Sequence, residues 1–314
     1  MLNIKEKQCT NSVDICGILS ELNVEPKTST DGREFVTCEA KIKVDQDVNG
    51  KMTENEIPVQ FYSMKYKKGT VEAGNPVVSK VYTSICEFPT KFKSLASLSD
   101  EKKDEASKVV IQGGSLGETV FLDEATKQEK TGFRVSSNFL NATRSNNFDA
   151  DGKFVQSARF ELSGVVLKTA REVDGNGEET GRLKVTLGVV GYQGRVDKFT
   201  LIAETPSCVD HIETNWQEGD TVNVYGAISF KSSVKTWKEE LGFGEPIVRT
   251  KTETRKELII LGGSPSGLEE AYSYDSDDIK AGLLERKERI AKSAQKKNAG
   301  AATAPTNKGG AFDF

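Results

Sequence analysis

The feature that most constrains the fold of this chain is an internal repeat. A segment that begins at Val13 has a counterpart that begins at Phe160, and each carries a glycine, Gly17 or Gly164, near its middle. A glycine inside a strand is typical of a sharp bend in a barrel. Four further segments of the first half also have counterparts in the second. The matched pairs are 13–19 with 160–167, 33–44 with 182–190, 56–62 with 196–202, 108–116 with 220–228, and 132–140 with 255–261.

Each half therefore carries five strand signals, with a less regular segment after the third, at 63–107 and at 203–218. Five short strands in this arrangement are the pattern of the OB-fold. We expect a mainly β protein with two tandem five-stranded OB-type β-barrels, followed by a flexible, partly helical C-terminal tail. The expected domains are 1–147, 148–267 and 268–314.

Alternating apolar residues on the second strand of each half predict one packed face and one wet face. The packed face holds Val36, Cys38, Ala40 and Ile42 in the first half, and Leu183, Val185, Leu187 and Val189 in the second. The opposite face holds Phe35, Thr37, Lys41 and Lys43, and in the second half Arg182, Lys184, Thr186 and Val190. Any antiparallel sheet has a wet face that carries lysines, so a solvated surface is the alternative. Basic residues on the same strand of both halves favour a binding face.

Composition excludes several classes of protein. The chain is 36% hydrophobic and 29% charged, which is enough apolar material for small packed cores. No apolar run approaches the roughly 20 residues of a membrane helix, and residues 1–13 lack the apolar core of a signal peptide. We therefore expect no membrane partner and a cytoplasmic location. The net charge of −4 does not exclude a nucleic-acid partner, because the distribution of charge matters more than its sum.

Catalytic and metal chemistry have no motif in this sequence. The five cysteines are odd in number and form no C-x-x-C pair, and His211 is the single histidine. A zinc site needs closely spaced Cys and His ligands, so we expect no metal, no cofactor and no disulfide framework. The sequence has no Walker A loop, no H-E-x-x-H motif and no nucleophile elbow. We therefore expect a binding protein and not an enzyme.

Three segments resemble single-stranded-DNA-binding proteins of the phage- or plasmid-encoded kind. They are the strand that opens at Phe160, the Gly-Asp-Thr-Val-Asn-Val-Tyr-Gly run at 219–226, and the Phe-Asp-Phe tip that ends at Phe314. The sequence departs from that family in three ways: two barrels lie in one chain, the tip carries one acidic side chain, and residues 281–308 are basic. The resemblance implies an OB-fold, a bacterial or phage-infected host cell, and a monomer or homodimer in place of the usual tetramer.

Non-specific single-strand binding needs aromatic rings that stack on bases and cations that follow the phosphates. We selected aromatic residues out of phase with the core, and basic residues near them. The expected contacts in the first half are Phe35, Lys41, Lys43, Tyr62, Lys65, Tyr66 and Lys68. The expected contacts in the second half are Arg182, Lys184, Tyr192, Arg195, Lys198, Tyr225, Lys231, Lys235 and Trp237. By the same phase test Phe61, Phe199 and Leu201 belong to the core. Trp216 precedes a turn and is expected to pack, because tryptophan is largely buried in most proteins. Trp237 either stacks on bases or closes a small loop cluster.

The predicted function is the binding and protection of single-stranded DNA, without strong sequence preference, during replication and recombination. The alternative is an OB-fold module that binds protein or RNA. In the tail, Ser276 is expected to cap a helix that runs to about Lys297. The terminal residues Phe312, Asp313 and Phe314 are expected to bind replication or recombination proteins, because a terminal phenylalanine fits an apolar pocket and its carboxylate a basic residue. A frayed end is the alternative for this segment.

Overall fold

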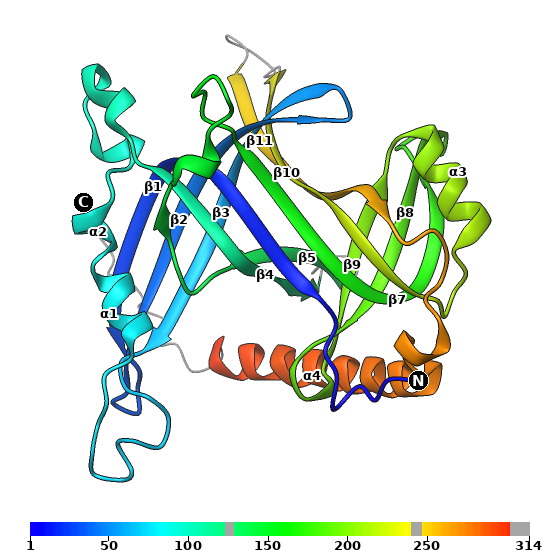
Figure 1. Ribbon diagram of the computed structural model, residues 1–314, viewed down its shortest axis with the longest axis horizontal. Coiled ribbons are helices and arrows are strands. Elements are labelled where there is room, and N and C mark those ends of the chain that lie inside the picture. Colours follow the sequence, from blue (N-terminus) through cyan, green and yellow to red (C-terminus); the bar gives the residue numbers. More distant parts are fainter. Residues whose placement is uncertain (123–128, 240–246, 302–314) are drawn as a thin grey trace, which may run out of the picture.

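The computed structural model describes residues 1–122, 129–239 and 247–301. The predicted mainly β architecture is confirmed, with two barrels side by side and a long C-terminal helix beneath them (Figure 1). Each half has the five predicted strands, and every matched segment overlaps one of them, although the segment 132–140 runs past the end of its strand at Ser136. Most of the strands extend beyond the segments matched in the sequence.

The first barrel has the strand order β1-β2-β3-β5-β4, and β4 pairs back with β1. This order is that of an OB-fold. Its strands are β1 (Asn11–Thr28), β2 (Glu34–Val48), β3 (Lys51–Met64), β4 (Lys108–Leu122) and β5 (Glu129–Ser136), with a short β6 (Asn141–Ala142) beside β4. Between β3 and β4 lie α1 (Lys80–Cys86), α2 (Phe88–Lys91) and the 3-10 helices η1 (Leu95–Ser97) and η2 (Asp100–Glu105). After β6 follows η3 (Ser145–Asn147).

The second barrel repeats this order as β7-β8-β9-β11-β10, and β10 pairs back with β7. Its strands are β7 (Ser157–Val173), β8 (Glu179–Val190), β9 (Val196–Ala203), β10 (Thr221–Glu239) and β11 (Ile247–Gly263). The 3-10 helix η4 (Tyr192–Gly194) joins β8 to β9, and α3 (Pro206–Asn215) lies between β9 and β10. After β11 follow η5 (Glu270–Tyr272) and α4 (Ser276–Ala301).

The two barrels share their hydrogen-bond register in detail. The β1–β2 ladder shifts by one residue between Leu19 and Glu21, and the β7–β8 ladder shifts between Val166 and Lys168, which are the corresponding positions. Each barrel closes through a short parallel pairing between its third and fifth strands, Val59 with Val135 and Leu201 with Leu258. These shared irregularities make the two halves true structural repeats.

The barrels meet along an antiparallel pairing of β1 with β7, which makes one continuous sheet of eleven strands. In this pairing Val13 lies opposite Phe160, its own counterpart in the repeat. A strand that pairs with its counterpart in antiparallel fashion places a twofold relation between the two units. The chain therefore contains within itself the kind of contact that a symmetric dimer makes between subunits.

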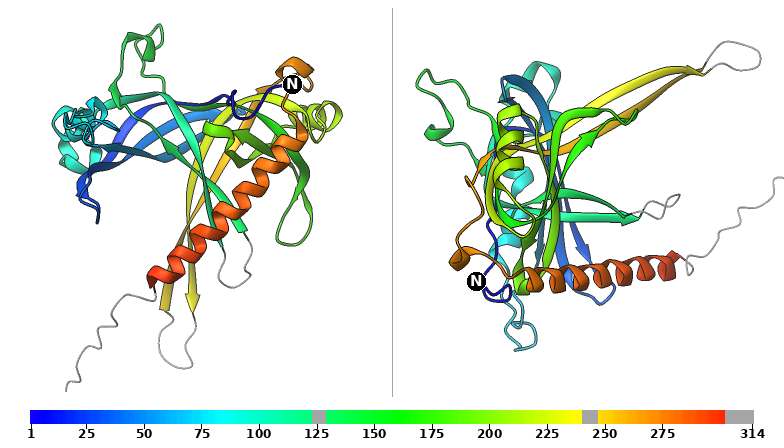
Figure 2. Two further views of the ribbon diagram at one scale, coloured as in Figure 1. Left: turned by 90° about the horizontal axis from the view of Figure 1, so that it is seen from below. Right: turned by 90° about the vertical axis from the view of Figure 1, so that its right-hand side faces the viewer.

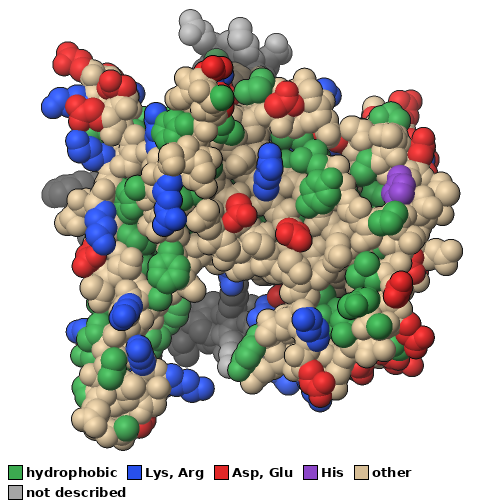
Figure 3. All heavy atoms as spheres, in the orientation of Figure 1, with side chains coloured by type: hydrophobic (Ala, Val, Ile, Leu, Met, Phe, Trp, Pro, Cys, Tyr) green, Lys and Arg blue, Asp and Glu red, His purple; other side chains and the backbone are tan. Residues whose placement is uncertain are grey.

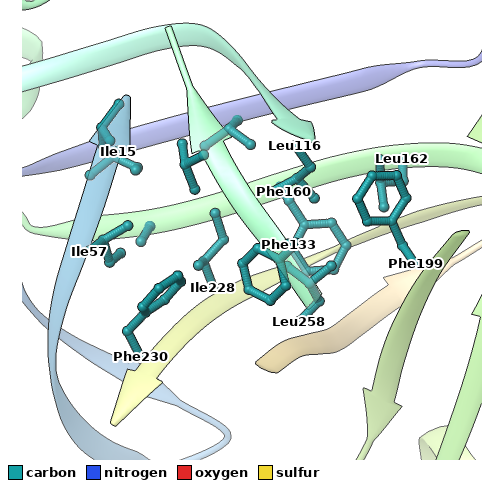
Figure 4. Packing of buried hydrophobic residues seen from close by; sticks show 14 of the residues in the cluster. Ile15, Ile57, Leu116, Phe133, Phe160, Leu162, Phe199, Ile228, Phe230 and Leu258 are labelled. Atoms are coloured by element: carbon teal, nitrogen blue, oxygen red, sulfur yellow. The ribbon is translucent and has the colours of Figure 1, made fainter. Parts of the chain in front are cut away.

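One hydrophobic core runs through both barrels. Figure 4 shows Ile15, Leu116 and Phe133 of the first barrel in the same cluster as Phe160, Ile228 and Leu258 of the second. The rings of Phe133 and Phe230 meet edge to face across the barrels, with 5.4 Å between their centroids. The predicted core positions Phe61, Phe199, Leu201 and Trp216 are buried, as are all eight residues assigned to the packed face.

Two local predictions are corrected by the structure. Val190, assigned to the wet face, is buried under Ile4, Tyr274 and Ile279, which reach it from the N-terminal segment and from the start of α4. The helix α4 does begin at Ser276, but the side chain of Asp275 accepts the hydrogen bond from the Asp277 N–H, at 2.7 Å. The preceding aspartate therefore does the capping that the sequence had assigned to Ser276.

Three elements extend from the same side of the molecule: α4, the β4–β5 hairpin and the β10–β11 hairpin (Figure 2). The first turns of α4 pack against the second barrel through Ile279 and Leu283. Further along, Arg286 is buried and forms ion pairs with Glu118 of β4 and Glu129 of β5, while Arg289 bonds Asp197 of β9 at 3.0 Å. The helix therefore bridges the two barrels. Within the described residues, no helix is long and apolar enough to cross a membrane.

Candidate functional site

A groove of about 890 Å³ crosses the outer face of the first barrel. All five strands of the barrel contribute to this first-barrel groove, because alternate residues of β1, β2 and β3 face outward beside the ends of β4 and β5. Of the predicted contacts, Lys41 and Tyr62 line it, and Phe35 adjoins it with its ring 5.7 Å from that of Tyr62. Tyr62 is 55% exposed, so its ring is available for stacking.

The rest of the first-barrel groove is polar, and sequence reasoning missed these residues. Amides and hydroxyls gather there, with one arginine: Asn23, Thr37, Gln60, Ser115, Arg134, Ser136, Ser137 and Asn138. Three glutamates also line it: Glu21, Glu25 and Glu39. Most of them lie on the five strands of the barrel, and their outward positions in the alternation could have identified them.

Carboxylates offset the lysines of this groove. Lys41 bonds Glu21 at 2.7 Å, and Lys27 bonds Glu25 at 2.5 Å. The hydrogen bond to Glu21 raises the pKa of Lys41 above its usual value, which keeps the ammonium charged at neutral pH. The groove therefore offers hydrogen-bonding groups and a tyrosine ring, with little excess charge.

A second predicted group lies at the edge of the first barrel, beside the end of β2. The Lys65 ammonium bonds both carboxylate oxygens of Glu34 at 2.9 Å and lies over the Tyr66 ring, 5.4 Å from its centroid. Lys68, which is close to Lys65 in the sequence, is exposed. Lys43 lies on β2, and its ammonium is 3.8 Å from the Glu54 carboxylate. Neither Lys43 nor Lys65 lines the first-barrel groove.

The second barrel carries a smaller slot of about 300 Å³ on its β8, β9 and β11 face, beside the β5 strand of the first barrel. Of the predicted contacts, Lys184 and Lys198 line this second-barrel slot, together with Arg255 and Lys256, which sequence reasoning missed. Lys231 lies directly opposite Arg255 in the β10–β11 ladder.

Two glutamates hold the cations of the slot in position. Arg182 bonds Glu172 at 2.9 Å and Glu257 at 2.7 Å. Lys184 lies 3.3 Å from Glu172, and Arg255 bonds Glu257 at 2.8 Å. Burial alone would raise the pKa of Glu172, but the charges of Arg182, Lys184 and Arg255 hold it below its usual value. Three cationic side chains therefore contact two carboxylates, and Lys198 and Lys256 add two more cations to the lining of the slot.

Three predicted contacts lie away from both grooves. Tyr192 is exposed in η4, and Arg195 beside it bonds Asp197 at 2.8 Å. Tyr225 lines a third hollow, of about 360 Å³, at the β1–β7 seam together with Arg159. The Tyr225 ring covers Gly262, since a Cβ there would lie 2.3 Å from the tyrosine oxygen.

The remaining predicted residues lie outside the described part of the chain. Lys235 and Trp237 belong to β10, but their side chains are not described. Phe312, Asp313 and Phe314 are not described at all. On the face drawn in Figure 3, lysine and arginine side chains are scattered among acidic and hydrophobic ones. In the residues that the structure describes, no group of three or more His, Cys, Asp or Glu side chains is placed to hold a metal ion.

Comparisons with known proteins give the following matches. The model of the YorF family matches residues 10–296. The wild-type single-stranded DNA binding protein from Thermus aquaticus superposes with a TM-score of 0.45 and 12% identity, over 82% of this chain and 93% of that one. A deletion mutant of the Thermus aquaticus protein gives a TM-score of 0.44 and 13% identity, over 84% and 97% of the two chains. No curated protein matches the sequence significantly.

Proposed function

The chain belongs to the YorF family, and we propose that it binds single-stranded DNA without strong sequence preference and without catalysis. The observation that carries the proposal is the first-barrel groove, which crosses all five strands of an OB barrel and has Tyr62 open to solvent within it. Single-strand binding by OB-folds relies on such a surface, with rings that stack on bases. Because every base has an aromatic face, stacking tolerates any sequence.

The polar lining of the groove agrees with this function. Side-chain amides and hydroxyls such as Asn23, Gln60 and Ser136 both donate and accept hydrogen bonds, and unpaired bases expose edges that do the same. The cations of the second-barrel slot supply the attraction to phosphate that the first-barrel groove lacks. Together the two faces offer contacts for both the bases and the phosphates of a single strand.

The test is an anisotropy titration of labelled oligo-dT with wild type and Tyr62→Ala. A stacking ring contributes about 1–3 kcal/mol per base, so we expect Tyr62→Ala to bind roughly 5- to 150-fold more weakly. Tyr272→Ala, which removes an exposed tyrosine from η5 outside both grooves, is the matched control and keeps wild-type affinity. Absence of binding by the wild type at low salt would refute the proposal, and tighter binding of a matched oligo-U would favour an RNA-binding role.

We further propose that the DNA-binding role serves replication or recombination and that Phe312, Asp313 and Phe314 recruit a partner protein. The motivation is the aromatic tip at the end of a chain segment that is otherwise poor in aromatic residues. Deletion of the three residues is expected to leave oligo-dT affinity unchanged and to remove replication proteins from a pull-down. An unchanged pull-down would reject this role for the tip.

A further inference from the structure

The outer faces of the two barrels differ in charge at three equivalent positions. The shared ladder registers align β1 with β7, β2 with β8, and β3 with β9, residue by residue. Three glutamates of the first barrel then have lysine counterparts in the second. The pairs are Glu21 with Lys168, Glu39 with Lys184, and Glu56 with Lys198. At these three positions the second barrel is therefore more positive than the first, although Glu25 and its counterpart Glu172 are both acidic.

The two faces also differ in width. The turn between β2 and β3 reaches across to the second barrel, where Val48 packs on Ile202, Ala227 and Ile259. Beside it, the Asn49 side chain donates a hydrogen bond to Glu204 at 2.9 Å. This contact covers part of the second face and leaves a slot of about 300 Å³, against about 890 Å³ in the first barrel. The first face therefore carries the larger groove, and the second a smaller slot lined by cations.

The carboxylates act differently in the two sites. In the first-barrel groove, Glu21 and Glu25 each pair with a single lysine and so cancel its charge. In the second-barrel slot, the Glu172 and Glu257 side chains are only 11% and 12% exposed and lie behind the cations. Lys184 and Arg255, by contrast, keep 43% and 58% of their side-chain surface open. The two glutamates thus anchor the cationic groups of Lys184 and Arg255, whose side chains stay partly open to solvent.

We propose that the two barrels divide a single strand of DNA between them: the first-barrel groove holds bases, and the second-barrel slot holds the phosphodiester backbone. This division rests on the proposed single-strand binding. Tyr62 and the amides serve the first task, and Lys184, Lys198, Arg255 and Lys256 serve the second. Glu172 and Glu257 are positioning residues that act through the cations.

The salt dependence of oligo-dT binding tests the division. For single strands, the slope of log K against log salt changes by about 0.7 for each phosphate contact. The double substitution Lys184→Gln and Lys198→Gln is expected to reduce the slope by about 1.4 and to weaken binding at low salt. Tyr62→Ala is expected to weaken binding without changing the slope. Lys51→Gln with Lys102→Gln, two exposed lysines outside both grooves, is the control for general loss of charge.

An abasic oligodeoxynucleotide, which has the backbone and no bases, separates the two sites directly. Wild type and Tyr62→Ala are expected to bind it equally, and the double lysine variant to lose at least tenfold in affinity. The division is overturned if Tyr62→Ala weakens abasic binding as much as oligo-dT binding, or if the lysine variant keeps wild-type affinity and slope. Wild type that binds neither oligo-dT nor the abasic chain instead refutes single-strand binding itself. Urea unfolding midpoints show whether each variant is folded. Lys256→Gln, a second substitution in the slot, tests whether the loss of affinity depends on the cations and not on misfolding.

Discussion

Gly17 and its counterpart Gly164 show how close the strands of each barrel approach at the bend. A Cβ on Gly17 would lie 2.4 Å from the Lys43 carbonyl oxygen, and a Cβ on Gly164 would lie 2.9 Å from the Gly188 carbonyl oxygen. Neither glycine has a positive φ, so the constraint is the distance to the neighbouring backbone. The glycine that marked the repeat in the sequence is thus required by packing between strands.

The substitution Gly17→Ala is therefore expected to lower the free energy of unfolding by about 1–3 kcal/mol, the usual cost of overpacking. Gly175→Ala is the matched control, since nothing lies within 4 Å of a Cβ at that turn residue and its φ is not positive. It is expected to be neutral, or to stabilise by up to about 1 kcal/mol through the unfolded state. Urea denaturation measures both, and equal effects would contradict this account of Gly17.

Single residues could be assigned to a face from the sequence, but their neighbours could not. The alternation placed Phe61 and Phe199 in the core correctly, because period two follows directly from strand geometry. It gave Val190 the wrong environment, because the residues that cover it come from the chain ends, at Ile4 and Tyr274. It likewise gave no sign that Glu21 neutralises Lys41, since that pairing depends on the register between two strands.

At the scale of elements, the bridging of the two barrels by α4 could not be predicted from the sequence. The helix itself was predictable, but its apolar residues Ile279 and Leu283 explain only the contact with the second barrel. The contact with the first barrel depends on Arg286, which looks in the sequence like one more surface charge. Its side chain and that of Glu118 are each only 2% exposed.

Removal of Arg286 leaves the Glu118 carboxylate buried without its partner, so Arg286→Leu is expected to destabilise the protein by about 3–5 kcal/mol. The double variant Arg286→Leu with Glu118→Leu should recover much of this loss, because no buried charge remains. Lys280→Ala, which breaks an exposed ion pair with Asp277 on the same helix, should cost less than about 1 kcal/mol. Urea denaturation measures the free energy of unfolding of all three variants. If Arg286→Leu were no more destabilising than Lys280→Ala, the packing of α4 would not depend on the Arg286–Glu118 pair.

At the scale of the whole molecule, the order of strands followed from the repeat, and so did the two-barrel architecture. The relation between the barrels did not, because β1 and β7 pair through strand edges that carry no sequence signal. This pairing and one hydrophobic core join the two barrels. The domain boundaries at residues 147 and 267 stay predictions.

Buried hydrogen bonds add to the contact between the two barrels. Gln46 of β2 donates to the Ile228 carbonyl at 3.0 Å and accepts from the Ala158 N–H at 2.7 Å. Asn55 of β3 accepts from the Phe230 N–H at 2.9 Å. Separation of the barrels would expose these groups together with the Phe133–Phe230 contact.

We therefore expect the two barrels to unfold as one cooperative unit. In native-state hydrogen exchange, the core amides of Val59 and Leu201, one in each barrel, should report the same free energy of opening. Gln46→Ala leaves two buried backbone groups unpaired, at about 1–3 kcal/mol each, and should lower both values together. Gln217→Ala, at an exposed glutamine, should change neither. If Gln46→Ala lowered the value in one barrel alone, the barrels would be independent folding units, and their shared core would contribute little to the stability of either.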